Sequence, residues 1–191
     1  MRYLGIIVFL SLLFISCDEE TLPKPSAFLS LEYPPPEYRN VSLPLPFTFE
    51  KNNWADSIMS VKISRDQKVK GIDLNYPQMK GTIYITYKKI EENNLRSFLI
   101  DAQAITQKHT IKANEIIEQP YIDEENRIFG MFYEVGGDAA SQSQFYVTDS
   151  LNHFVTGSLY FYAKPNYDSI LPAAYYLRND IKHVMETIRW Q

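Results

Sequence analysis

The sequence predicts an α+β domain in which an antiparallel sheet is flanked by helices. Several segments alternate β-branched or aromatic residues with polar ones and are separated by short turns, which is typical of hairpins. Two other segments, one between the strands and one near the C-terminus, repeat apolar residues at spacings of three and four, which is typical of helices. Apolar residues are 45% and charged residues 22% of the 191 residues, so one domain with its own core is expected.

Residues 1–16 are predicted to be the signal peptide of a lipoprotein. Arg2 gives a positive start, Leu4 to Ile15 form the apolar region, and the small residue Ser16 directly precedes Cys17, the only cysteine. The apolar run is about a dozen residues, well short of the roughly 20 that a membrane-spanning helix needs. Because cleavage before a cysteine accompanies its acylation, we expect Cys17 to carry lipid and to anchor the chain in a membrane.

Residues 17–26 are predicted to be an acidic, proline-bearing tether, and residues 27–191 a single α+β domain. With Cys17 acylated there is no second cysteine, so packing rather than disulfides must stabilise the domain. The net charge is −4 and there is no dense cluster of Lys and Arg, so nucleic acid is not an expected partner.

The first part of the domain is expected to contain edge strands. Residues 27–33 alternate imperfectly and then meet three prolines, which indicates a short edge strand or an extended arm. Residues 43–49 look like another edge strand with proline at its start. Residues 52–66 have no clear period and are expected to be irregular, or to hold a short helix around 54–59. Residues 72–76 and 82–87 alternate on either side of a turn at 77–81, which predicts a hairpin.

The middle of the chain predicts a helix and then further strands. Asn93 or Asn94 would cap a helix whose apolar residues run from Leu95 to Ile105, with His109 closing the stripe. Strands are then predicted in the following segments: 127–135, 143–148 and 154–163, with turns at Gly136-Gly137 and at 149–153.

A long helix is predicted to end the chain. Asp168 or Ser169 would cap it, and Pro172 would lie in its first turn, where proline is tolerated. Apolar residues then recur with helical period up to Ile188, and Trp190 is expected to fold back onto the core.

The sequence shows no pattern typical of an active site, so no enzyme, metal or cofactor is expected. The chain has no G-x-S-x-G elbow, phosphate-binding glycine loop or zinc motif. Its histidines, His109, His153 and His183, fall in three different elements. Acidic residues 123–125 lie in one polar stretch, which favours a solvated loop over acid/base chemistry.

Asp-Ser pairs occur at 56–57, 149–150 and 168–169. Such pairs are good turn formers and helix caps, which is the interpretation we prefer. They also resemble a short motif for O-glycosylation in some bacterial envelopes.

A set of short segments resembles the gliding-motility lipoprotein GldD family in both content and order. The segments are Leu22-Pro23-Lys24-Pro25, Tyr84-Ile85-Thr86-Tyr87-Lys88, His109-Thr110-Ile111-Lys112-Ala113, Gly137-Asp138-Ala139-Ala140-Ser141, Gln144-Phe145-Tyr146-Val147-Thr148-Asp149-Ser150, His153-Phe154, Gly157-Ser158-Leu159-Tyr160-Phe161 and Pro165-Asn166-Tyr167-Asp168-Ser169. The resemblance implies an accessory envelope lipoprotein of bacterial gliding, linked to type IX secretion, with no catalytic residues to transfer. It also implies a fold similar to the PsbP-like and Mog-like α/β/α sandwiches, a purely topological analogy.

The hairpin from Gly136 to Ser150 and the turn at His153 are the best candidates for a partner-binding surface. Amide and acidic groups there lie beside aromatic residues, a combination typical of protein interfaces. The candidate residues are Gln142, Gln144, Phe145, Tyr146, Asp149 and His153. The alternative, that these residues serve only the turn, is equally compatible with the sequence.

Two functions therefore follow. The first is a non-enzymatic scaffold or assembly factor, held by its lipid in the inner or outer membrane, facing the periplasm and contacting motility and secretion proteins. The second is a lipoprotein that binds a glycan or a peptidoglycan fragment in an open groove lined by Tyr84, Tyr160 and Tyr162.

Overall fold

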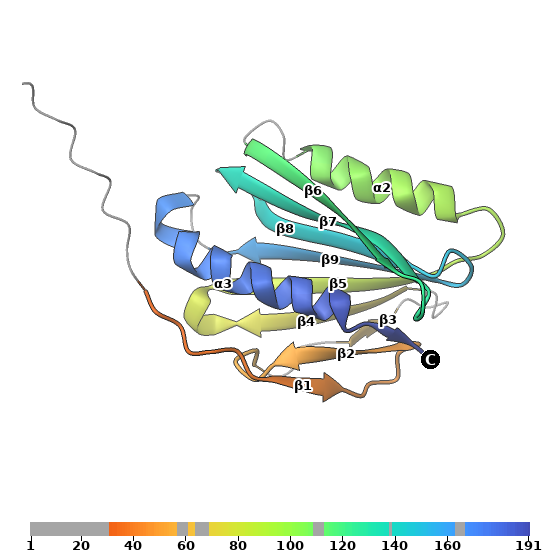
Figure 1. Ribbon diagram of the computed structural model, residues 1–191, viewed down its shortest axis with the longest axis horizontal. Coiled ribbons are helices and arrows are strands. Elements are labelled where there is room, and N and C mark those ends of the chain that lie inside the picture. The colour runs from red at the N-terminus through yellow and green to blue at the C-terminus, as the bar shows by residue number, and fades with distance from the viewer. Residues whose placement is uncertain (1–30, 57–60, 64–68, 109–112, 138, 163–166) are drawn as a thin grey trace, which may run out of the picture.

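The computed structural model describes residues 31–56, 61–63, 69–108, 113–137, 139–162 and 167–191. In these residues it shows two antiparallel sheets and two α-helices (Figure 1). The predicted α+β class is confirmed.

The larger sheet has seven strands in the spatial order β3-β4-β5-β9-β8-β7-β6, and all neighbours are antiparallel. The bounds are β3 Val61–Ile63, β4 Val69–Tyr76, β5 Gly81–Lys89, β6 Ala113–Asp123, β7 Ile128–Gly137, β8 Ser141–Thr148 and β9 His153–Phe161. A short 3₁₀ turn, η2 (Pro77–Met79), joins β4 to β5. After β5 the chain passes through helix α2 (Leu95–Lys108) to the far edge at β6, and returns strand by strand until β9 pairs with β5.

A smaller sheet brings both ends of the domain together. Its order is β1 (Tyr38–Val41), β2 (Phe47–Asn52) and β10 (Arg189–Trp190), with β2 in the middle. The first strand, β1, and the last strand, β10, are therefore both paired with β2. In Figure 1 this sheet lies below the large one, beside the end of helix α3 (Tyr167–Glu186).

The two helices lie on opposite faces of the large sheet (Figure 1). Side chains of consecutive strand residues point to opposite faces, and Phe154 and Val155 of β9 show the division. The Phe154 ring lies 5.5 Å from that of Phe98 on α2, whereas Val155 belongs to the larger core with Leu177 of α3. The predicted arrangement of a sheet flanked by helices is thus observed.

The larger core lies under α3, which buries the predicted apolar stripe. Leu177 and Ile181 of α3 have no exposed surface. Beneath them, Phe145 of β8 lies across Gly157 of β9, and a Cβ atom at Gly157 would be 2.1 Å from the Phe145 ring. Gly157 is therefore required by the close approach of this ring.

The hairpin of β4 and β5, helix α2, and strands β8 and β9 agree with the predictions, and helix α3 agrees in its apolar stripe. Trp190 does fold back, since it pairs in the small sheet and packs against the larger core. The predicted segment 43–49 is partly right: β2 starts at Phe47, after prolines that cannot donate to a ladder.

In the first part of the chain the structure decides between the predicted alternatives and adds two strands. Leu31 to Tyr33 are not a strand, which agrees with the extended arm, and residues 27–30 lie outside the described part. Residues 54–56 are irregular rather than helical, and residues 57–60 are not described. Strands β1 (Tyr38–Val41) and β3 (Val61–Ile63) were not predicted.

Three further differences concern turns and an edge. Gly136 and Gly137 do not form the turn but end strand β7, where Gly137 has a φ of 95°. The 11-residue strand β6 was not predicted, because as an edge strand it exposes polar residues and so lacks a clean alternation. Helix α3 begins at Tyr167, so Asp168 and Ser169 lie within it and Pro172 lies beyond its first turn.

Candidate functional site

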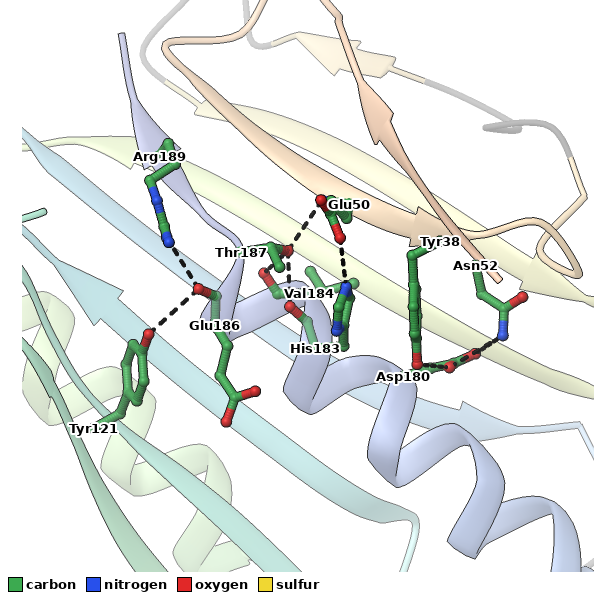
Figure 2. A network of polar contacts seen from close by, with 10 residues as sticks. All are labelled: Tyr38, Glu50, Asn52, Tyr121, Asp180, His183, Val184, Glu186, Thr187 and Arg189. Carbon is green, nitrogen blue, oxygen red and sulfur yellow. Dashed lines mark hydrogen bonds and ion pairs between the residues drawn. The ribbon is translucent and has the colours of Figure 1, made fainter. Parts of the chain in front are cut away.

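A buried carboxylate on α3 is the centre of a polar cluster that fastens the N-terminal segment to the domain (Figure 2). Asp180 is 1% exposed. It accepts hydrogen bonds from the Tyr38 hydroxyl (2.7 Å) and from the Asn52 side-chain amide (2.9 and 3.1 Å). The same amide donates to the Tyr176 hydroxyl (3.0 Å). Strands β1 and β2 are thereby joined to the last helix.

The electrostatics of this cluster follow from its burial. Burial raises the pKa of the Asp180 carboxyl, and the hydrogen bonds from Tyr38 and Asn52 oppose the rise because they stabilise its ionised form. Burial and the neighbouring Asp180 carboxylate also raise the pKa of Tyr38 and of the buried Tyr76. Both tyrosines therefore stay protonated, and the Tyr38 hydroxyl donates to Asp180.

A second pair of contacts continues this cluster along α3. The His183 ring stacks on Tyr38, with centroids 3.5 Å apart, and its Nε2 lies 2.8 Å from a Glu50 carboxylate oxygen. The Glu50 backbone N–H donates to the Thr187 hydroxyl (3.0 Å). Tyr33, earlier in the N-terminal segment, packs against Tyr176 at 5.3 Å. The polar groups joined by dashed lines in Figure 2 are thus used in contacts inside the protein.

The end of α3 is held as well. The backbone carbonyl of Glu186 accepts hydrogen bonds from the Tyr121 hydroxyl (3.3 Å) and from Arg189 (3.0 Å). Carbonyls in the last turn of a helix lack partners within the helix. Tyr121 on β6 and Arg189 on β10 supply them, and so tie both sheets to this helix end.

Sequence reasoning missed the Asp180 cluster. Its signal is a charged residue inside the apolar stripe of the last helix, between Leu177 and Val184. A carboxylate in that position needs hydrogen-bond donors from neighbouring elements. Which elements supply them depends on the tertiary fold, so Tyr38 and Asn52 could not be found from the sequence.

The six residues predicted to bind a partner are mostly buried. Gln142, Gln144, Phe145 and Asp149 are at most 7% exposed. The Gln142 amide donates to the backbone carbonyls of Gly137 (3.2 Å) and Ala139 (2.8 Å), and Phe145 lies in the core. These side chains lie on one strand and its turn, as predicted, but face the interior.

Asp149 shows the turn-forming interpretation directly. One of its carboxylate oxygens accepts backbone N–H bonds from Leu151, Asn152 and His153 at 2.8 to 3.0 Å. Burial alone would raise the pKa of Asp149, but these hydrogen bonds outweigh it and the pKa is lowered. Ser150, with a φ of 67°, completes the turn.

Tyr146 and His153 are only half-buried and lie on different faces. Tyr146 packs with the α2 cluster, where its ring stacks on Phe154 at 5.9 Å. The His153 ring stacks on Trp190 at 5.1 Å, and its Nδ1 lies 3.1 Å from the Tyr87 hydroxyl. Burial lowers the pKa of His153, and the nearby Asp149 charge opposes this only in part.

The tyrosines expected to line a glycan groove do lie together, on the face of the large sheet where α2 packs. The hydroxyls of Tyr84 and Tyr162 are 2.7 Å apart, and the Tyr84 and Tyr160 rings meet edge to face at 5.8 Å. Tyr162 is 66% exposed. A shallow cavity of about 230 Å³ beside it is lined by Asp73, Asn75, Thr82 and Tyr162. The Tyr162 hydrogen bond raises the pKa of Tyr84 to about 12.

A second cavity, of about 150 Å³, lies between α3 and the adjoining ends of β6, β7 and β8. Charged and polar residues line it together with apolar ones. They are Glu115, Ile117, Glu134, Val135, Gly136, Gln142, Ser143, Leu171, Ala174, Tyr175 and Arg178. Of the six predicted residues, this cavity includes Gln142.

Other expected features fall outside what the structure describes. Cys17, residues 1–16 and the tether lie before residue 31, and His109 follows the end of α2. Neither described helix combines the length and apolar character that a membrane crossing requires. In the described ranges, no three His, Cys, Asp or Glu side chains gather in a way that could hold a metal ion.

The fold and these clusters define an antiparallel α+β domain whose N-terminal segment is fastened to its last helix by a buried polar cluster. The sequence matches the family described as gliding motility lipoprotein GldD over residues 18–190, and the chain belongs to this family. It is therefore a lipoprotein related to gliding motility, which indicates the cell envelope as its location. Neither the curated proteins nor the solved structures include a match.

Proposed function

We propose that this chain is a lipid-anchored, non-enzymatic accessory protein that holds together envelope proteins of the gliding and type IX secretion apparatus. Membership in the GldD family over residues 18–190 carries the proposal. In the proposed mature protein, residues 1–16 are removed, Cys17 carries lipid in the inner or outer membrane, and the domain faces the periplasm. The fold would be the α/β/α sandwich of PsbP-like and Mog-like proteins, as a topological analogy.

The Asp180 cluster supports a scaffold because it fixes the anchored end to the domain. A chain anchored at Cys17 enters the fold through Tyr33 and then β1. Tyr33 packs on Tyr176 of α3, and Tyr38 of β1 donates a hydrogen bond to Asp180 of α3. Buried polar groups that are hydrogen-bonded to one another stabilise a single arrangement and are not available to a substrate. A domain held in one arrangement suits a protein that positions partners.

The test is replacement of the lipidated residue in cells. Cys17→Ser should abolish incorporation of labelled palmitate, move the protein out of the membrane fraction and stop gliding. Ser16→Ala, which keeps a small residue before the cysteine, is the matched control and should retain all three. Gliding at the wild-type rate with an unlipidated Cys17→Ser protein would contradict the proposed anchoring.

A second candidate function is binding of a glycan or peptidoglycan fragment at the tyrosine face. The exposed Tyr162 ring beside Asp73 and Asn75 favours it, because sugars pack on aromatic rings and bond to acidic and amide groups. Tyr162→Ala should then weaken binding of purified muropeptides at least tenfold. Tyr175→Ala, which removes an exposed ring from the opposite face, should not. Equal binding by both variants would exclude this site.

Tyr146 and His153 remain proposed contact residues of the hairpin region, since both keep part of their surface exposed. Tyr146→Ala or His153→Gln should reduce gliding without lowering the amount of folded lipoprotein. Retention of full motility by both variants would remove the hairpin from the proposed interface.

A further inference from the structure

The cavity between α3 and the large sheet lies over one row of residues that crosses three strands. Ile117 of β6 pairs with Glu134 of β7, which pairs with Ser143 of β8. Directly opposed residues on neighbouring strands point to the same face. On the helix side, Leu171, Ala174, Tyr175 and Arg178 are spaced as one face of α3. The cavity is therefore a gap between one face of α3 and the row of strand residues beneath it.

The backbone around this cavity is irregular in a way that re-aims side chains. The register shifts between Ala113 and Glu115 on β6, and again between Ser141 and Ser143 on β8. Gly137, between them in sequence, has a left-handed φ of 95°. Bulges are over-represented next to functional sites, because they turn a side chain out of the regular pleat.

The charge of the wall favours a cation. Glu134 and Arg178 neutralise each other, with 2.8 Å between carboxylate and guanidinium, and the Arg178 guanidinium also lies over the Tyr175 ring at 4.9 Å. Glu115 makes no ion pair within the described residues and is exposed at the rim. Carboxylates only accept hydrogen bonds, which matches the ammonium of Lys or the guanidinium of Arg, groups that only donate.

The size and position of the cavity favour a protein partner over a metabolite. Pockets for small ligands are typically about 300 to 1,000 Å³, whereas about 150 Å³ holds a single long side chain. The cavity opens beside β6, the last strand of the sheet, whose residues Ile117 and Glu118 are exposed. Pro120 has no N–H to donate, so a strand added to β6 would pair only with the part before it.

We propose that an extended segment of a protein partner pairs along β6 between Glu115 and Gln119 and inserts one Lys or Arg side chain into this cavity. The inserted cation meets Glu115 at the rim, while Tyr175 and Ile117 cover its aliphatic stem. The proposal rests on the scaffold function above, and specifies the surface and the chemistry of one partner.

Binding can be measured with the purified full-length lipoprotein in detergent. The probe is a fluorescein-labelled hexapeptide, Thr-Val-Arg-Val-Thr-Val, and its Kd is read by fluorescence anisotropy beside versions in which Gln or Glu replaces Arg. The Arg peptide should bind at least tenfold tighter than the other two. Equal affinities, or no binding of the Arg peptide at 1 mM protein, would overturn the proposal.

Matched variants locate the probe. Glu115→Gln should weaken the Arg peptide about fivefold, since an exposed ion pair contributes up to about 1 kcal/mol. Glu118→Gln, on the same strand but outside the cavity wall, should change its Kd less than twofold. Ala174→Leu, which fills the cavity, should weaken it at least tenfold, with circular dichroism confirming the fold. Equal effects of Glu115→Gln and Glu118→Gln would show that only the general charge of the edge matters.

An experiment in cells separates this proposal from the scaffold function. A photocrosslinking amino acid at position 175 should give an adduct to a Lys- or Arg-bearing strand segment, and Glu115→Lys should remove both the adduct and gliding. If deletion of the gene stops gliding but Glu115→Lys changes neither, the cavity proposal fails and the scaffold function stands. If deletion leaves gliding intact, the scaffold function itself fails.

Discussion

Replacing Tyr38 by Phe tests whether the N-terminal segment is held by the buried carboxylate. The change removes the hydroxyl that lies 2.7 Å from Asp180 but keeps the ring that stacks on His183. A hydrogen bond to a charged group contributes about 1.5 to 3 kcal/mol to stability, more than a neutral one. We therefore expect Tyr38→Phe to lower the free energy of unfolding by about 2 kcal/mol.

The expected effect is measurable by heat and by denaturant. For a chain of this size, about 2 kcal/mol corresponds to a fall in Tm of about 4 to 8 °C. Urea unfolding of the full-length lipoprotein, followed by circular dichroism, should show a lower midpoint with an unchanged slope. Tyr175→Phe is the control, because Tyr175 is half exposed on the same helix. It should change stability by less than about 0.5 kcal/mol.

The pH dependence gives a second, independent readout. Burial raises the pKa of Asp180 in the folded protein, and the Tyr38 hydroxyl opposes that rise. In Tyr38→Phe this hydrogen bond is lost, so the pKa of Asp180 rises further. The full stability difference of about 2 kcal/mol between wild type and variant is therefore expected only at pH values where Asp180 is ionised in both folded proteins. The difference should shrink as the pH falls through these pKa values. A difference that is constant or grows on acidification, or a loss no larger than in Tyr175→Phe, would refute the role of this bond.

The remaining predictions concern the core and the β8–β9 turn. Gly157→Ala should lower the free energy of unfolding by about 1 to 3 kcal/mol, because the new methyl group meets the Phe145 ring; thermal unfolding of a variant as stable as wild type would contradict that packing. Asp149→Ala should lose about 1 to 3 kcal/mol at neutral pH. Since the folded-state pKa of Asp149 is lowered, this contribution should disappear from urea titrations as the pH falls through that pKa. In a variant whose other tryptophan, Trp54, is replaced by Phe, protonation of His153 should quench the fluorescence of the stacked Trp190 ring. Because burial lowers the pKa of His153, the midpoint should lie below pH 6.5, and His153→Gln should abolish the transition.

The sequence predicted best those elements whose burial follows a simple period. Strands β4 and β5 alternate because one face of each is buried in the larger core, and α3 shows its period because one side lies on that core. Strand β6 could not be found this way, because it is an edge strand with exposed residues on both faces. Strand β1 was missed for a similar reason, since two of its four residues are exposed.

The candidate site was harder to predict because polarity does not report burial in a central strand. Residues 141–144 of β8 are all polar, which favoured a surface hairpin, yet each is at most 6% exposed. Strand β8 lies between β7 and β9, with α3 over one face and α2 beside the other, so residues 141–144 are enclosed whatever their polarity. Such residues need partners inside the protein, as Gln142 has, or leave an unsatisfied group, as Ser143 does.

Helix α3 carries both the anchor contacts and the proposed partner cavity, on different sides. Asp180 and His183 face the small sheet, whereas Ala174 and Arg178 face the cavity. A partner bound at the cavity is therefore connected to the N-terminal segment through one rigid helix. Because the two sites share no side chain, their energies should be independent. Tyr38→Phe should leave the Kd of the Arg peptide within twofold, and Glu115→Gln should leave unfolding within about 0.5 kcal/mol. Coupling in either direction would mean that the cavity and the anchor contacts form one site.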